Sequence, residues 1–128
     1  MTPFGLKIRE IRSERKIALK TMAHALDVSP AYLSALEHGH RGKPSHHLVQ
    51  KIIAYFNIIW DDAEELERLA DVSHPRVVID TAGLDPIATD LANTLASSIG
   101  KFSRKDLEHL KKELDSRLSA RKTSFDSK

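Results

Sequence analysis

Apolar residues recur every three or four positions through most of the first 73 residues of this 128-residue chain, the spacing of one face of an α-helix. Short interruptions, among them the glycine- and proline-bearing loop HGHRGKP, divide this pattern into five segments. The predicted helices lie at about 3–15, 19–26 and 30–38, from Ser45 onward, and at about 60–72. Five short helices with connections of a few residues predict a compact all-α domain over residues 1–73.

The third predicted helix has a well-defined start and end. Ser29 is a typical N-cap, Pro30 suits the first helical turn, and Gly39 suits the left-handed position that ends a helix. Its large aliphatic residues, Leu33 and Leu36, lie on one face, whereas the residues on the other face are mostly small. We therefore expect this helix to dock through one side and to present an outer face with little bulk.

The composition changes after the fifth predicted helix. Residues 74–86 have prolines near both ends and the β-branched run Val77-Val78-Ile79, which predicts a short extended linker or strand. Such a strand would be able to pair with the same strand of a second copy of the chain. Residues 121–128, at the end of the chain, are expected to form a disordered tail.

Two further helices are predicted at about 86–99 and 104–120, because leucine and isoleucine recur there at helical spacing, and residues 87–120 thus form a helical accessory segment. Two helices of this length bury little by themselves, so their apolar faces are expected to cover the N-terminal domain or a second chain. A homodimer is the favoured interpretation, and an intramolecular cap is the alternative. The residues expected at the dimer interface are Leu91, Leu95, Ile99, Leu107, Leu110, Leu114 and Leu118.

Charge is distributed unevenly along the chain, although the formal net charge is only +2. Residues 1–60 carry nine lysines and arginines against four acids, a net charge of +5. Residues 61–128 carry eleven against fourteen, a net charge of −3. A basic N-terminal half is typical of a domain that binds a polyanion such as a nucleic acid.

The composition also argues against several classes of protein. The chain has no cysteine, which excludes disulfides and thiol catalysis and suits a reducing cytoplasm. No apolar run approaches membrane-spanning length, and the N-terminus is charged where a signal peptide needs an apolar core. A cytoplasmic protein without a membrane segment is therefore expected.

No pattern of catalytic or metal-binding residues stands out. Four histidines gather between residues 38 and 47, but no cysteine or suitably spaced carboxylate accompanies them, so no metal site is predicted. The acidic run at residues 61–65 is expected to be a solvated helix start, where the helix dipole favours acids. No nucleophile elbow, phosphate loop or HExxH motif is present, so neither enzymatic activity nor a cofactor is expected.

The stretch FGLKIREIRSERKIALKTMAHALDVSPAYLSALEHGHRGKPS carries many residue types at family-specific spacings. It resembles the Cro/C1-type helix-turn-helix of the XRE family of bacterial and phage regulators, over about residues 4–72. The matching residues are Gly5, Ile8, Arg12, Met22, Ala23, Leu26, Val28, Ser29, Leu33, Ser34, Leu36, Glu37, Gly39, Pro44 and Ser45. The resemblance implies a five-helix, lambda repressor-like domain that binds double-stranded DNA.

The resemblance also implies which residues contact DNA. The start and outer face of the third helix would contact base edges through Pro30, Ala31, Tyr32, Ser34 and Ala35. The start of the second helix, the end of the third and the loop after it would contact phosphates through Leu19, Lys20, Thr21, His38, His40, Arg41 and Lys43. A partly buried ion pair would hold the third helix to the first and would consist of Arg12 and Glu37.

Departures from the family pattern put DNA affinity in question rather than the fold. Ala18 and Leu19 stand where Ser or Thr and then Gln are common, so the second helix lacks an N-cap. Asp27 replaces the turn glycine, and Asp tolerates the left-handed conformation better than most residues. The outer face of the third helix has no Gln, Asn, Arg or Lys, the usual bidentate base readers. We expect modest direct readout, supplemented by loop contacts and DNA shape.

The favoured interpretation is a dimeric, sequence-specific transcriptional regulator that reads a palindromic operator, as a repressor rather than an activator. Two alternatives remain open. One is an autoregulatory antitoxin of a toxin–antitoxin pair, in which residues 74–128 would hold the toxin. The other is a protein-binding adaptor whose helical head does not bind DNA. The sequence identifies no small-molecule effector.

Overall fold

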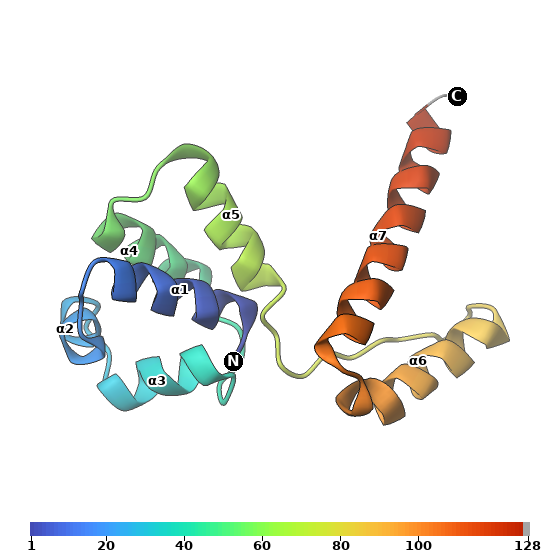
Figure 1. Cartoon of the computed structure of the whole chain (residues 1–128), viewed down its shortest axis with the longest axis horizontal. Helices are drawn as coiled ribbons and strands as arrows, with labels where there is room; N and C mark the ends of the chain where they lie inside the picture. The colour runs from blue at the N-terminus through green and yellow to red at the C-terminus, as the bar shows by residue number, and fades with distance from the viewer. Residues whose placement is uncertain (127–128) are drawn as a thin grey trace. The chain divides into compact units, whose positions relative to one another are not determined.

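The computed structural model describes residues 1–126, and helices make up most of that range, with one long connection at residues 72–85 (Figure 1). It divides into two compact units, residues 1–78 and the chain from residue 79 onward. The first unit contains α1 (Pro3–Glu14), α2 (Leu19–Ala25), α3 (Pro30–His38), α4 (His46–Phe56) and α5 (Trp60–Asp71). The second contains α6 (Pro86–Ser98), the 3-10 helix η1 (Ile99–Lys101) and α7 (Arg104–Asp126). The predicted all-α fold is confirmed.

Three helices of the first unit begin at a side-chain cap. The side-chain oxygens of Thr2, Ser29 and Ser45 accept hydrogen bonds from backbone N–H groups at the starts of α1, α3 and α4, at 3.0–3.1 Å. Helix α2 begins after Ala18 without such a bond, as the sequence predicts. Helix α3 ends at Gly39, whose φ of 81° lies in the left-handed region. Local sequence therefore decides where these helices start and stop.

The five helices of the first unit enclose one apolar core. Helix α1 packs against α3 and α5, α2 packs against α3, and α4 packs against α5. Gly5 permits a close approach of α1 to α3, because a Cβ there would overlap the backbone of Glu37. The buried apolar residues are Phe4, Ile8, Met22, Ala23, Leu26, Leu33, Leu36, Leu48, Val49, Ile52, Phe56, Leu66 and Ala70.

Side chains from distant parts of the chain hold the ends of this bundle together. The buried hydroxyl of Ser73 accepts a hydrogen bond from the N–H of Phe4 at 2.8 Å and donates one to the carbonyl of Leu69. It thereby ties the start of α1 to the end of α5. Lys51 of α4 donates from Nζ to the carbonyl of Leu26 at 2.7 Å. The contacts of Ser73 and Lys51 thus hold the first and last helices of the bundle, and the turn before α3, in place.

The second unit has equally clear helix starts but no buried residue among those whose burial is described. Asp85 accepts a hydrogen bond from the N–H of Ile87 at 2.9 Å and caps α6. Ser103 and Asp106 exchange backbone-to-side-chain hydrogen bonds at 3.1 and 3.3 Å, the predicted cap of α7. Between residues 79 and 121, where side-chain burial is described, every residue is exposed or half-buried. These helices are therefore locally well specified but do not enclose a core of their own.

The structure narrows one expectation for the second half of the chain and corrects another. No strand occurs in the described range, and residues 77–80 form neither helix nor strand, so of the predicted linker or strand only the linker remains. Helix α7 does not end near residue 120 but runs to Asp126, so the tail predicted at 121–128 is helical at 121–126. The segment 104–126 contains no glycine or proline to end the helix, and ion pairs at i,i+4 spacing support it. Residues 127–128 lie outside the described residues.

Candidate nucleic-acid interface

Helix α2, a short turn and α3 form a helix-turn-helix whose turn is held from several sides. Asp27 adopts a φ of 58°, the left-handed conformation in which the family commonly has glycine. The next residue, Val28, donates from its N–H to the carbonyl of Ala23 at 3.0 Å, and its side chain packs against the core. The ammonium of Lys51 binds the carbonyl of Leu26 just before the turn. The angle between α2 and α3 is therefore constrained by backbone, core and a side chain from α4.

Helix α3 is docked through one face, as its sequence predicts. Leu33 and Leu36 are 1% and 3% exposed, and both belong to the core. The residues predicted to contact bases occupy the remaining surface. Pro30 and Ala31 are exposed, whereas the other three are half-buried, namely Tyr32, Ser34 and Ala35. The outward side of α3 is thus small in bulk and largely uncharged.

The predicted ion pair between α1 and α3 is present. Arg12 Nε lies 3.4 Å from Glu37 Oε1, and Arg12 Nη2 lies 3.4 Å from Glu37 Oε2. The two side chains are only 15% and 4% exposed. Arg12 also donates from Nη1 to the carbonyl of Ile17 at 3.3 Å. Because the pair is two-pronged and largely buried, its main effect is to fix the orientation of α3 on α1.

The start of α2 presents two exposed polar residues of the predicted phosphate-binding set, Lys20 and Thr21. The third, Leu19, packs its side chain against the core, so only its backbone N–H is available to a ligand. Because no side chain caps α2, its first N–H groups lack the acceptor that Ser29 supplies to α3. Free N–H groups at a helix start are suited to a phosphate oxygen.

The last residue of α3 and the loop after it carry the other predicted phosphate ligands, and all four are exposed. His38 donates from Nδ1 to the carbonyl of Ser34 at 2.8 Å, and its ring stacks on that of His40 with centroids 6.4 Å apart. The guanidinium carbon of Arg41 lies 5.8 Å from the centre of the Tyr32 ring.

The fourth of these residues, Lys43, is already paired within the chain. Its Nζ lies 3.7 Å from Oδ1 of Asp71 on α5. The two side chains are 46% and 77% exposed, so water screens the pair strongly. A phosphate would therefore compete with Asp71 for this lysine.

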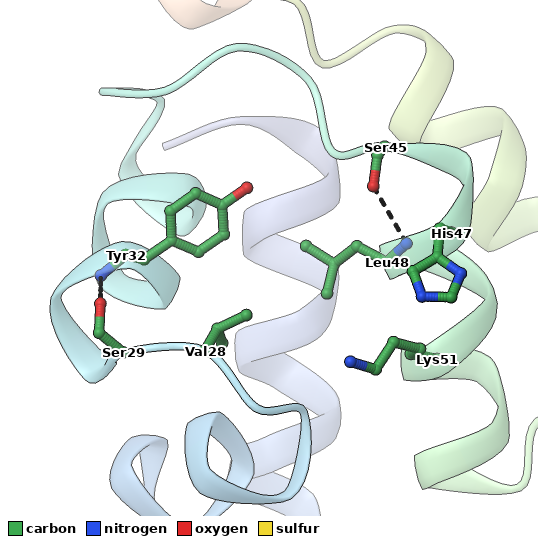
Figure 2. Close-up of a pocket in the computed structure, with 7 residues that line it drawn as sticks. All are labelled: Val28, Ser29, Tyr32, Ser45, His47, Leu48 and Lys51. Carbon is green, nitrogen blue, oxygen red and sulfur yellow. Dashed lines mark hydrogen bonds between the residues drawn. The ribbon is translucent and has the colours of Figure 1, made fainter.

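Two hollows open beside α3 and bring in residues that sequence reasoning missed. One of about 350 Å³ separates the start of α3 from the start of α4 (Figure 2), lined by Val28, Ser29, Tyr32, Ser45, His47, Leu48 and Lys51. Another of about 450 Å³ lies between α2 and α3, lined by Lys20, Thr21, His24, Val28 and Pro30. His24 follows Lys20 by four positions, a helical spacing that would have identified it. His47 had no comparable signal, because only the packing of α4 brings it near α3.

The other candidate chemistries receive no support from the described residues. No group of three or more potential metal ligands occurs among them. Asp61 and Asp62 lie exposed in the first turn of α5. A hydrogen bond from Arg68 lowers the pKa of the Glu65 carboxyl, and the two groups form an ion pair on the helix surface. No described helix combines the length and the apolar character needed to cross a bilayer.

Comparisons with known proteins concern the same part of the chain. Residues 8–59 match the helix-turn-helix family. A relative described as an uncharacterized HTH-type transcriptional regulator, RghRB of Bacillus subtilis (strain 168), is 32% identical over 62 residues. The matched part is 48% of this chain and 45% of the relative, so the chain spans less than half of the relative's length. No solved structure gives a significant match.

Proposed function

We propose that this chain, whose residues 8–59 form a Cro/C1-type helix-turn-helix, binds double-stranded DNA and regulates transcription. The main observation behind the proposal is the way in which α3 packs on the first unit. Its Leu33 and Leu36 are buried in the core and its Glu37 is paired with Arg12, so the opposite face of α3 is directed away from the core. A helix held in this way can enter a major groove as a rigid body.

Base contacts are proposed for the start and outer face of α3. The residues concerned are Pro30, Ala31, Tyr32, Ser34 and Ala35. Small side chains at these positions let the backbone of α3 approach the base edges closely. Alanine methyl groups can meet thymine methyl groups, and the serine hydroxyl can donate or accept a hydrogen bond. We expect part of the sequence preference to come from DNA shape, because bidentate readers are absent from this face.

Phosphate contacts are proposed for the start of α2, for the end of α3 and for the loop after it. The residues concerned are Leu19 through its N–H, together with Lys20, Thr21, His38, His40, Arg41 and Lys43. To these we add His24, which lines the same hollow as Lys20 and Thr21. Contacts of this kind set affinity and register without reading sequence.

We further propose that the regulator is a homodimer, that α6 and α7 form its interface, and that it acts as a repressor. Most large apolar side chains of these helices are solvent-exposed in the single chain, Leu107 at 39% and Leu118 at 62% among them, whereas Leu95 is half-buried. The interface would contain Leu91, Leu95, Ile99, Leu107, Leu110, Leu114 and Leu118. Two copies would read a palindromic operator, since a two-fold protein matches two-fold DNA.

The same exposed faces of α6 and α7 favour a second candidate, an autoregulatory antitoxin. In that case a toxin of different sequence, rather than a second copy, would cover the leucines. Purification of the untagged chain from its native host distinguishes the two, because an antitoxin would retain a stoichiometric toxin and a homodimer would not.

Selection of binding sites from random double-stranded DNA with the full chain tests the main proposal. We expect enrichment of a palindrome whose half-sites lie about 10 base pairs apart, or a multiple of that. Ala31→Glu, which places a negative charge on the exposed face of α3, serves as the inactive comparison. No enrichment by the unmodified chain, even at low salt, would contradict DNA binding and favour a protein-binding adaptor.

A further inference from the structure

Tyr32 and Arg41 are nine positions apart, but the fold brings them together beside α3. The guanidinium carbon of Arg41 lies 5.8 Å from the centre of the Tyr32 ring, within the range of a cation–π contact. In the described part of the chain, the guanidinium of Arg41 makes no hydrogen bond or ion pair. Since the guanidinium contacts a ring rather than a hydrogen-bond acceptor, its N–H donors remain available to a ligand.

Of the two residues, Tyr32 is the one that the fold holds in place. Its N–H binds Oγ of Ser29 at 3.0 Å in the capped first turn of α3, and its ring packs against the core. Figure 2 shows the ring as one wall of the hollow beside α3, opposite Ser45 and His47 at the start of α4. The ring is therefore a rigid platform on the margin of the DNA-facing helix.

Arg41 lies in a segment that restrains it little. It falls between Gly39 and Gly42, outside any helix, and its side chain is exposed. A long exposed arginine side chain loses rotamer freedom when it binds a phosphate, and this loss opposes binding. A contact that already holds the guanidinium before DNA arrives reduces that loss.

We propose that Tyr32 is a positioning residue for Arg41: its ring holds the guanidinium beside α3, ready for a DNA phosphate. The inference rests on the proposed DNA binding and changes the main role of Tyr32 from a base contact to a support. The ring, not the hydroxyl, is the functional part of Tyr32.

The test combines two substitutions of Tyr32 with one of Arg41. Tyr32→Phe keeps the ring and removes the hydroxyl, whereas Tyr32→Leu keeps apolar packing and removes the ring. We expect Tyr32→Leu to bind selected DNA about two- to fivefold more weakly than Tyr32→Phe, the range of an exposed cation–π contact, because only the phenylalanine keeps a ring beneath the guanidinium. Arg41→Gln should make the plot of log binding constant against log salt concentration less steep by about 0.9, the value for one phosphate contact. The double variant Tyr32→Leu with Arg41→Gln should bind no more weakly than Arg41→Gln alone.

A second measurement needs no DNA. The ring current of Tyr32 should shift the side-chain proton resonances of Arg41 upfield in the free protein, in the unmodified chain and in Tyr32→Phe but not in Tyr32→Leu. Thermal unfolding followed by circular dichroism identifies any loss of fold. Tyr55→Leu, at another half-buried tyrosine, controls for removal of a tyrosine ring in general, and should leave the Arg41 resonances unchanged.

The outcomes separate this inference from the proposed function. Additive effects of Tyr32→Leu and Arg41→Gln on DNA binding, or equal losses in Tyr32→Phe and Tyr32→Leu, overturn the inference and leave DNA binding intact. Unchanged Arg41 resonances in Tyr32→Leu overturn it as well. Failure of the unmodified chain to bind any DNA overturns the proposed function and this inference together.

Discussion

The two units of this chain use the same signals to begin helices but reach different outcomes. Helix α3 starts with Ser29 and Pro30, and α6 starts with Asp85 and Pro86, in each case a capping side chain followed by proline. In the first unit the helices enclose thirteen buried apolar residues, whereas between residues 79 and 121 none is buried. Capping therefore specifies helices, but burial is what turns helices into a self-sufficient domain.

The difference indicates what each unit is for. The first unit buries its own apolar residues and needs no partner to cover them. The second presents a row of half-exposed and exposed leucines, and monomeric proteins rarely leave such an extended apolar surface uncovered. Its stability as a unit should thus depend on a partner chain.

Removal of the second unit should give the largest effect. A chain that ends at Val78 is expected to fold and to remain monomeric, because the core of the first unit is complete without α6 and α7. Operator binding should weaken about 100-fold or more, since the loss of a linked second half-site removes avidity. Analytical ultracentrifugation and DNA titration measure the two properties. A dimer that survives the truncation would refute the placement of the interface.

The second largest effect should be a difference in folding stability between two matched leucine-to-alanine substitutions, one in each unit. Leu33 is 1% exposed and Leu114 is 54% exposed. Leu33→Ala should lower the free energy of unfolding by about 2–5 kcal/mol, because it leaves a cavity in the core. Leu114→Ala should change the stability of the dilute monomer by less than about 0.5 kcal/mol but weaken self-association. Urea unfolding at several protein concentrations tests this. Equal losses in the free energy of unfolding for both variants in dilute solution would contradict the stated difference between the two units.

Substitutions at the helix N-caps should have a smaller effect, on the stability of the first unit and on the helicity of the second. Ala18→Ser supplies the N-cap that α2 lacks, and should raise the free energy of unfolding by about 1 kcal/mol. Ser103→Ala removes the cap of α7 and should reduce helicity in the second unit without changing the unfolding of the first. Thermal unfolding and far-ultraviolet circular dichroism report these effects. A destabilised first unit in Ser103→Ala would show that the units are coupled.

The smallest effect should come from the substitution of single surface lysines, and it should appear in the salt dependence of DNA binding. Lys20 is exposed at the start of α2, and Lys112 is exposed on α7. Lys20→Gln should make the decline in DNA affinity between 50 and 200 mM salt roughly threefold smaller, since one phosphate contact contributes a slope of about 0.9. Lys112→Gln should leave the salt dependence unchanged. Equal changes in both variants would mean that the second unit also contacts DNA.

Much of the first unit was predictable because its signals are local or belong to a family pattern. The capped starts of α3 and α4, the left-handed Gly39 and the uncapped α2 follow from residues within one helical turn. The Arg12–Glu37 pair was expected from the resemblance alone and is present at 3.4 Å. The length of α7 was underestimated, because the sequence after residue 120 carries no apolar pattern and its helix is supported by charge pairs earlier along the same element.

The sequence by itself determined the helices, their ends, the basic first half and the small outer face of α3. Each of these depends on residue type and on neighbours within a few positions. Only the tertiary structure decided which of the candidate DNA-contacting residues already have a partner within the chain. It pairs Lys43 with Asp71, sets Arg41 over the ring of Tyr32 and brings His47 beside α3. Those contacts join separate elements, and their formation depends on how the core directs each helix, which no local pattern specifies.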